Sequence, residues 1–215
     1  AAQTEVSEAT RTATFTPGRD AARKEASKLN VPRIGVRFRL PASMNQVEYF
    51  GRGPAENYLD RNAGSMIGLY KSTAEELYFP YVRPQENGHH TDTRWVSLST
   101  GKKGLLIQAD NTIGFNALRN SIEDFDDEEA TGLSRQWSNF TPEQVANHDE
   151  AAAKNVLRRQ HHINDITPCD FVEVCVDLKQ QGVAGYDSWG SRPEPAYTLP
   201  ANREYNWGFT LIPLK

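Results

Sequence analysis

The chain has 215 residues, of which 38% are hydrophobic, and a formal net charge of −4. This length suits one substantial domain with its own core, and the longest apolar runs fall far short of the roughly 20 residues that a membrane-spanning helix requires. The basic residues are scattered rather than gathered into a stripe, so the sequence predicts a soluble protein that binds neither nucleic acid nor a membrane. The N-terminal residues contain no readable targeting signal, and the compartment, cytoplasmic or periplasmic, stays open.

Strands dominate the pattern along the chain. Residues 1–30 are polar and predict a weak edge strand around residues 13–15 followed by a linker, and the main domain is expected over residues 31–215. Alternation of apolar and polar residues predicts further strands at 33–40, 47–50, 78–82, 94–98, 104–108, 113–117, 172–178 and 205–211. We expect 78–82 to pair with 94–98 as a hairpin, and residues 109–112 to form a turn between their two flanking strands.

The middle of the chain has a different character. Six of the seven residues from Glu123 to Glu129 are acidic, which favours a solvated loop over a calcium site. Thr141-Pro142-Glu143-Gln144 predicts the start of a helix over roughly 142–154. About eight or more short strands with one helical excursion predict a mainly β fold, a large antiparallel β-sandwich with one or two short helices.

The two cysteines, Cys169 and Cys175, flank or lie within a predicted strand. An extended chain holds residues six positions apart roughly 20 Å from each other, so these two are not expected to form a disulfide. They also lack the CxxC spacing of a zinc site. No cofactor is expected in this chain.

The main candidate site is the segment Gly185-Tyr186-Asp187-Ser188-Trp189-Gly190-Ser191-Arg192-Pro193 between the last two predicted strands. An indole presented on a loop can stack against the C–H face of a sugar ring, and Asp187 and Arg192 can hydrogen-bond its hydroxyls. The alternative interpretation is that Trp189 caps the end of the sandwich core.

Histidines and carboxylates give weaker signals. Neighbouring residues of a strand point to opposite faces, so the pairs His89-His90 and His161-His162 can each give at most one ligand to a shared metal. His90 follows the Asn87-Gly88 turn and is a candidate sugar contact at a loop rim. Glu56 and Asp60 could converge on a bend as a glycosidase carboxylate pair, although Asp60 beside Arg61 is more simply explained as a turn cap or ion pair.

Five sequence motifs occur in order along the chain. They are Val31-Pro32-Arg33-Ile34-Gly35-Val36, Tyr49-Phe50-Gly51-Arg52-Gly53-Pro54, Glu56-Asn57-Tyr58 with Asp60-Arg61, Tyr81-Val82-Arg83-Pro84-Gln85-Glu86-Asn87-Gly88, and Asp187-Ser188-Trp189-Gly190 with Arg192-Pro193. With these motifs the chain resembles the C-terminal domain of the large β-galactosidases of glycoside hydrolase family 2, over roughly residues 31 to 214. The resemblance implies a galactose-mutarotase-like supersandwich that packs against a catalytic barrel lying outside this chain.

The resemblance also assigns roles. Trp189 corresponds to the tryptophan of the family's Asp-Ser-Trp motif, which stacks on the bound sugar. The two catalytic carboxylates of a retaining, double-displacement mechanism lie in the barrel, so no catalytic residue is expected here, and any divalent cation belongs to that catalytic domain. The implied partners are a galactoside substrate, the remaining domains of the same polypeptide and further copies in a homo-oligomer.

Two other functions stay open. A stand-alone carbohydrate-binding module would need further exposed aromatic residues beside Trp189, for example Tyr186 or Tyr197. An aldose epimerase would need an acid–base pair, for which His90 and Glu86 are candidates.

Overall fold

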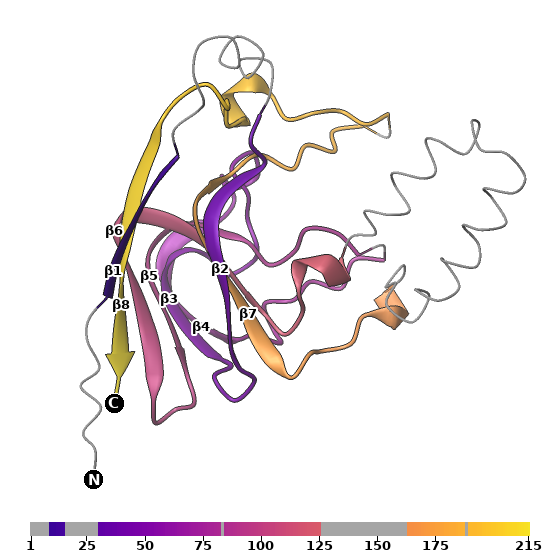
Figure 1. The fold of residues 1–215 in the computed structure, drawn as a ribbon. Coiled ribbons are helices and arrows are strands. Elements are labelled where there is room, and N and C mark those ends of the chain that lie inside the picture. Colours follow the sequence, from indigo (N-terminus) through magenta and orange to yellow (C-terminus); the bar gives the residue numbers. More distant parts are fainter. Residues whose placement is uncertain (1–8, 16–29, 83, 126–162, 188) are drawn as a thin grey trace, which may run out of the picture.

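The computed structural model describes residues 9–15, 30–82, 84–125, 163–187 and 189–215, and these form an antiparallel β structure (Figure 1). Every strand pairing among them is antiparallel, and the helices among them are short 3-10 turns, so the mainly β fold class is confirmed. A two-layer sandwich remains a prediction. The strands are β1 (Ala9–Phe15), β2 (Arg33–Pro41), β3 (Gln46–Gly53), β4 (Met66–Thr73), β5 (His90–Ser99), β6 (Gly104–Leu118), β7 (Phe171–Gln180) and β8 (Tyr205–Leu214).

The sheet divides at β6. One edge of β6 pairs with β5, which continues through β3 to β4. Its other edge is shared, because Gly104–Ala109 pairs with β8 and Gly114–Leu118 pairs with β7. The strands β8 and β1 therefore form one wing of the sheet and β7 and β2 form a second, as Figure 1 shows.

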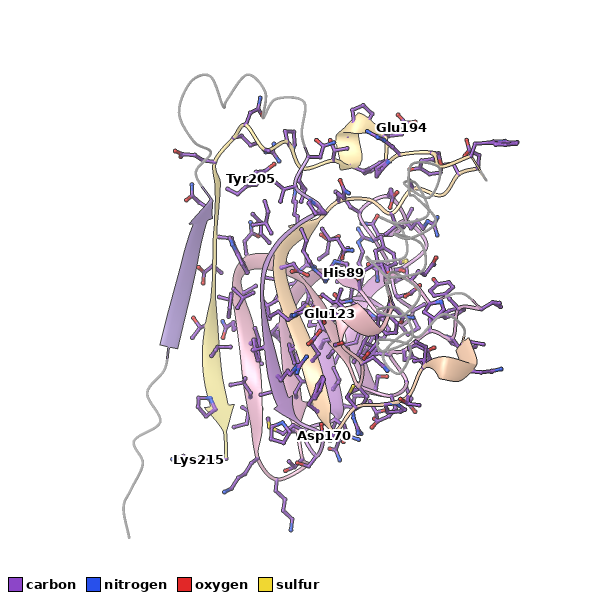
Figure 2. The ribbon with its side chains drawn as sticks, turned by 45° about the vertical axis from the view of Figure 1, so that its right-hand side comes forward. His89, Glu123, Asp170, Glu194, Tyr205 and Lys215 are labelled. Atoms are coloured by element: carbon purple, nitrogen blue, oxygen red, sulfur yellow. The ribbon has the colours of Figure 1, made fainter. Side chains whose placement is uncertain are left out.

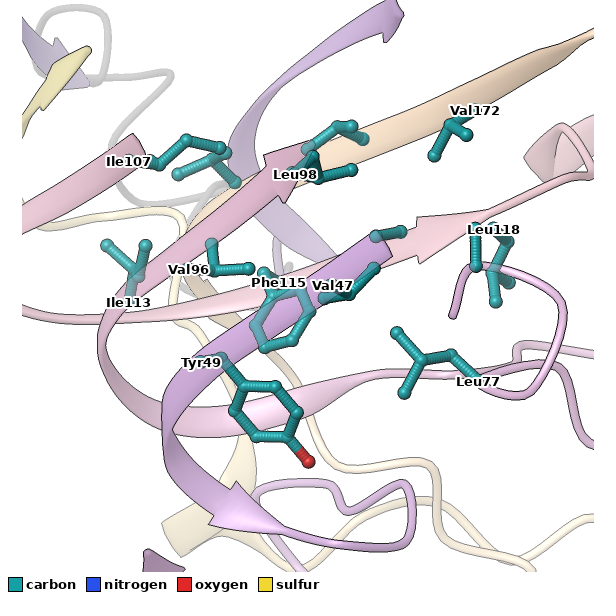
Figure 3. Packing of buried hydrophobic residues seen from close by; sticks show 14 of the residues in the cluster. Val47, Tyr49, Leu77, Val96, Leu98, Ile107, Ile113, Phe115, Leu118 and Val172 are labelled. Carbon is teal, nitrogen blue, oxygen red and sulfur yellow. The ribbon is translucent and has the colours of Figure 1, made fainter. Parts of the chain in front are cut away.

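The hydrophobic core lies on one face of the central strands (Figure 3). Tyr49 of β3 and Phe115 of β6 are fully buried and meet edge to face, with ring centroids 5.0 Å apart. Aliphatic side chains from four strands surround them, which ties the divided sheet together through burial of apolar surface. These are Val47, Val96, Leu98, Ile107, Ile113, Val172, Val174 and Val176.

The predicted turn at residues 109–112 is wrong, because β6 runs continuously from Gly104 to Leu118. Asp110 and Asn111 are exposed where β6 changes partner from β8 to β7, so their polarity reflects solvent contact rather than a reversal of the chain. Register shifts in the facing strand β5 occur between His90 and Trp95, where Asp92 adopts a positive φ of 52°. Such bulges bend a strand pair without ending it.

The predicted hairpin between residues 78–82 and 94–98 is also wrong. Both edges of β5 are already paired, one with β3 and the other with β6, so no edge is free for a third strand. Segment 78–82 is irregular and is held by a side chain instead: the backbone N–H of Phe79 donates to Asn87 Oδ1 over 2.8 Å. The edge strand β4 was not predicted.

The other strand predictions agree with β2, β3, β7 and β8, and the N-terminal strand appears as β1, paired with β8. Cys169 and Cys175 are both free thiols, as expected. The predicted helix at 142–154 and the acidic residues from 126 to 129 lie outside the described residues. Glu123, at the start of the acidic run, belongs to the 3-10 helix η1 (Ile122–Asp124) and pairs with Arg37 over 2.6 Å.

Charged side chains lie buried where the second wing joins β6. Asp177 of β7 is 1% exposed, and its Oδ2 accepts a hydrogen bond from Arg33 Nε over 2.9 Å and forms an ion pair with Arg33 Nη2 at 2.8 Å. Asp177 lies opposite a glycine on each side, Gly35 of β2 and Gly114 of β6. A Cβ atom on Gly35 would lie 1.9 Å from Asp177 Oδ1, and one on Gly114 would lie 2.5 Å from the His89 ring. The absence of side chains at Gly35 and Gly114 thus leaves room for the polar interior formed by Asp177 and His89.

We therefore expect Gly35→Ala to lower the free energy of unfolding by about 1–3 kcal/mol, because the new methyl group would displace the paired Asp177 carboxylate. Urea denaturation of the purified chain measures this. Gly64→Ala is the matched control, since a Cβ there meets no atom within 4 Å, and its effect should stay within about 0.5 kcal/mol. Equal stability of the two variants would contradict the argument.

Candidate functional site

Trp189 lies on the connection between β7 and β8, which extends from one end of the sheet (Figure 1). The side chain of Trp189 is 93% exposed, whereas Trp207 of β8 is 9% exposed. The indole therefore does not cap the core, which rules out the second interpretation of this residue. An exposed flat ring at the tip of a connection is available for stacking.

The loop around Trp189 is closed by its own side chains. Asp187 Oδ1 accepts hydrogen bonds from the backbone N–H of Trp189 over 2.8 Å and of Ser191 over 3.3 Å. Ser191 Oγ accepts from the N–H of Tyr186 over 2.9 Å. Gly190 adopts a φ of 84°, a left-handed conformation that glycine enters without cost. Asp187 thus shapes the turn that presents the indole.

Of the four predicted sugar contacts, the structure brings three to this loop. Asp187, Trp189 and Arg192 are all exposed within six residues of one another. His90 does not lie with them, because its side chain is 1% exposed and stacks on Phe115 with ring centroids 5.1 Å apart. The rim position expected for His90 is wrong: its strand carries the ring into the core.

The environment of His90 also removes the support for the epimerase alternative. Its Nδ1 faces the Gly88 carbonyl at 3.1 Å and its Nε2 faces the Pro54 carbonyl at 3.2 Å. Burial lowers the pKa of His90, although both carbonyl oxygens favour the protonated ring. Glu86, its proposed acid–base partner, lies near Asn116 and Arg33 instead, at 3.3 and 3.8 Å.

Glu56 and Asp60 bind different segments of the chain, and each has structural hydrogen-bond partners. Glu56 accepts hydrogen bonds from the Gly88 N–H over 2.7 Å and from the hydroxyls of Tyr58 and Tyr81. Burial and the Glu56 carboxylate raise the pKa of Tyr81 to about 12, so the phenol stays a donor. Glu56 therefore links the turn at residue 56 to the segments at 81 and 88.

Asp60 and Arg61 reach across to the base of the loop that carries Trp189. Asp60 accepts hydrogen bonds from the backbone N–H groups of Val183 and Ala184, at 3.1 and 2.8 Å, and Arg61 donates to the Ala184 carbonyl. The sequence predicted only a local turn cap or ion pair for these residues. The contacts join positions more than 120 residues apart, so no local sequence pattern predicts them.

His89 is 1% exposed and lies among the side chains of the interior (Figure 2). Its Nδ1 lies 2.8 Å from Asn116 Oδ1, and its ring stacks on Tyr58 with centroids 5.7 Å apart. Burial, with the Arg33 charge acting in the same direction, lowers the pKa of His89 to about 3. His89 is thus a neutral, structural side chain at physiological pH.

Within the described part of the chain, no group of three or more His, Cys, Asp or Glu side chains is arranged to hold a metal ion. In the same residues, no helix has the length and apolar character needed to cross a membrane. His161 and His162 lie outside these residues.

The fold and the exposed loop together define an antiparallel β domain that presents an aromatic side chain at one end. Residues 3–211 match the sequence profile of the family described as "Beta galactosidase small chain". The chain belongs to this family.

Curated relatives support the same assignment. The chain is 35% identical over 185 residues to a β-galactosidase of Priestia megaterium, an alignment that covers 86% of this chain and 15% of that protein. A β-galactosidase of Arthrobacter sp. is 41% identical over 99 residues, or 43% of this chain and 10% of that protein. One of Vibrio cholerae is 29% identical over 84% of this chain and 14% of that protein. The chain thus spans about 15% of the length of relatives that it matches along most of its own length.

The buried histidine predicts an acid-sensitive fold. An unfolded His89 takes up a proton near pH 6.5, whereas the folded one does so only near pH 3, so the unfolded state binds more protons between these values and stability falls as the pH falls. Replacing His89 with Asn should therefore reduce the stability difference between pH 7.5 and pH 5 by about 2 kcal/mol. Urea denaturation of both proteins at both pH values measures it.

Asp177 acts with the opposite sign. Burial raises its pKa from 3.8 to about 6 against the pull of Arg33, so its contribution declines as the pH rises through that window. Because both proteins keep Asp177, comparing them isolates the histidine. If His89→Asn shows the same pH dependence of stability as the wild type, His89 does not cause the loss of stability at low pH.

Proposed function

We propose that this chain supplies one wall of the sugar site of a retaining β-galactosidase through Trp189. The observation that carries the proposal is the 93% exposure of this indole on a loop whose backbone is tied by hydrogen bonds. Membership of the β-galactosidase small-chain family supports the proposed substrate class, a terminal β-D-galactoside.

The proposed role is binding and orientation. The C–H face of the galactose ring stacks on the indole, and exclusion of water there helps hold the anomeric carbon in place. Arg192 is a donor for ring hydroxyls from the same loop. Asp187 has the supporting role, because its carboxylate already accepts two backbone N–H groups beside Trp189.

The bond-breaking carboxylates are proposed to lie in the catalytic barrel, outside this chain. One carboxylate attacks the anomeric carbon and forms a glycosyl-enzyme, while an acid protonates the leaving oxygen; water then releases galactose with retention. Any divalent cation belongs to that part of the enzyme. The proposed partners of this chain are the galactoside, the remaining domains of the polypeptide and further copies of the enzyme.

In the assembled enzyme, we expect Trp189→Ala to lower kcat/KM for a β-galactoside roughly 10- to 100-fold, because the sugar loses its stacking surface. Its free energy of unfolding should change by less than about 0.5 kcal/mol, since an exposed side chain contributes little to stability. Leu69→Ala on β4 is the control, an exposed apolar truncation outside the loop. Wild-type kinetics in Trp189→Ala would overturn the proposal.

One observation favours the second candidate, a self-sufficient carbohydrate-binding module: Tyr186, in the same loop, is 54% exposed. Two aromatic rings can form a platform without a catalytic domain. The module predicts a saturable change in tryptophan fluorescence when the purified chain is titrated with galactose or lactose, lost in Trp189→Ala. The one-wall proposal predicts no change up to high millimolar sugar while circular dichroism shows an intact fold.

A further inference from the structure

We propose that Asp60 is a positioning residue, whose carboxylate fixes the base of the loop that presents Trp189 to the sugar. The proposal rests on the proposed function of Trp189. Asp60 lies in the turn after β3, and it acts on the sugar site only through the loop after β7 that carries Trp189.

The carboxylate of Asp60 binds this loop at three points. Oδ1 accepts from the N–H of Val183 over 3.1 Å, and Oδ2 accepts from the N–H of Ala184 over 2.8 Å and from the hydroxyl of Tyr186 over 3.2 Å. Bonds to an ionised acceptor are stronger than those between neutral groups. The strand β7 ends at Gln180, so the backbone N–H groups of Val183 and Ala184 lie beyond its strand pairing. The Asp60 carboxylate is their acceptor instead.

The backbone that Asp60 holds has an unfavourable conformation. Ala184 adopts a φ of 55°, in the left-handed region that a residue with a Cβ enters rarely, and its side chain is 2% exposed. Asp60 binds its N–H and Arg61 binds its carbonyl oxygen. A strained residue persists where its surroundings determine it, so these two side chains keep the chain turned toward Trp189.

Close packing leaves the Asp60 carboxylate little freedom to move away from the loop. A Cβ atom on Gly182 would lie 2.6 Å from Asp60 Oδ2, so the carboxylate rests directly against the loop backbone. The turn that carries Asp60 is itself anchored, because Arg61 N–H donates to the Tyr58 carbonyl over 2.8 Å and Tyr58 is 4% exposed. Asp60 thus ties the base of the loop to a turn that is itself fixed to the buried Tyr58.

The first experiment measures the hydrogen bonds from the loop backbone to Asp60, by amide hydrogen exchange in the assembled enzyme. In Asp60→Ala, the Val183 and Ala184 amides should exchange about tenfold faster, because each loses its acceptor, while amides of β7 keep their protection. Glu75→Gln is the matched control: that carboxylate binds Asn45 and Arg119, and its loss should leave the two amides and the activity unchanged. Unchanged exchange in Asp60→Ala would overturn the positioning role.

The second experiment asks whether Asp60 acts through Trp189, using Asp60→Ala, Trp189→Ala and the double variant. If it does, Asp60→Ala should lower kcat/KM about tenfold alone and by less than about threefold when Trp189 is already absent. Independent effects, which multiply in the double variant, would overturn the proposal even if each variant alone is impaired.

The two experiments separate this proposal from the function on which it rests. Wild-type kinetics in Trp189→Ala overturn the sugar-stacking function and with it the positioning role. Impaired Trp189→Ala with normal exchange in Asp60→Ala overturns the positioning role alone. If Asp60→Ala fails to fold, seen as lost protection in β7, Asp60→Asn replaces it: the amide keeps one acceptor oxygen, so at least one of the two backbone amides should exchange faster.

Discussion

The buried pair of Arg33 and Asp177 sets the arrangement on which the second wing of the sheet depends. Asp177 lies opposite Gly35 of β2 and Gly114 of β6, so its carboxylate stands where three strands meet. A buried ionised group must be satisfied by partners, and any shift in register would separate the carboxylate from the guanidinium. The apolar residues of β7 supply the burial energy on one face, while this pair on the other face specifies how the strands align.

The same polar interior continues toward the exposed loop. Arg33 donates to Asn116, Asn116 Oδ1 lies 2.8 Å from His89, and the His89 ring stacks on Tyr58. Tyr58 pairs through its backbone with Arg61, and from there the contacts pass to Ala184 and the loop. The exposed ring of Trp189 is therefore connected, through packed and hydrogen-bonded groups, to the buried carboxylate of Asp177.

The sequence predicted the elements whose signals are local. Alternating runs in β2, β7 and β8 revealed their strands, and the cluster of Gly, Asp and Ser around Trp189 revealed an exposed loop. It failed where distant segments decide the outcome. Asp110 and Asn111 resemble a turn, yet they lie in a continuous strand that changes partners, and His90 resembles a loop residue, yet its strand carries it inward. The contact of Asp60 with Ala184 left no trace in the local pattern, because it depends on the topology of the whole sheet.

The division of the sheet at β6 has a consequence for how the domain is made. β1 pairs with β8 from Ala9↔Leu211 to Phe15↔Tyr205, nearly the full span of the chain. During synthesis from the N-terminus, the second wing can form once β7 has emerged, but β1 and the first half of β6 must wait for β8. Until then they present open strand edges, which attract foreign strands, and closing so long a loop is slow. The strand β8, which follows all the other described strands along the chain, pairs with both of these edges and so closes both of them.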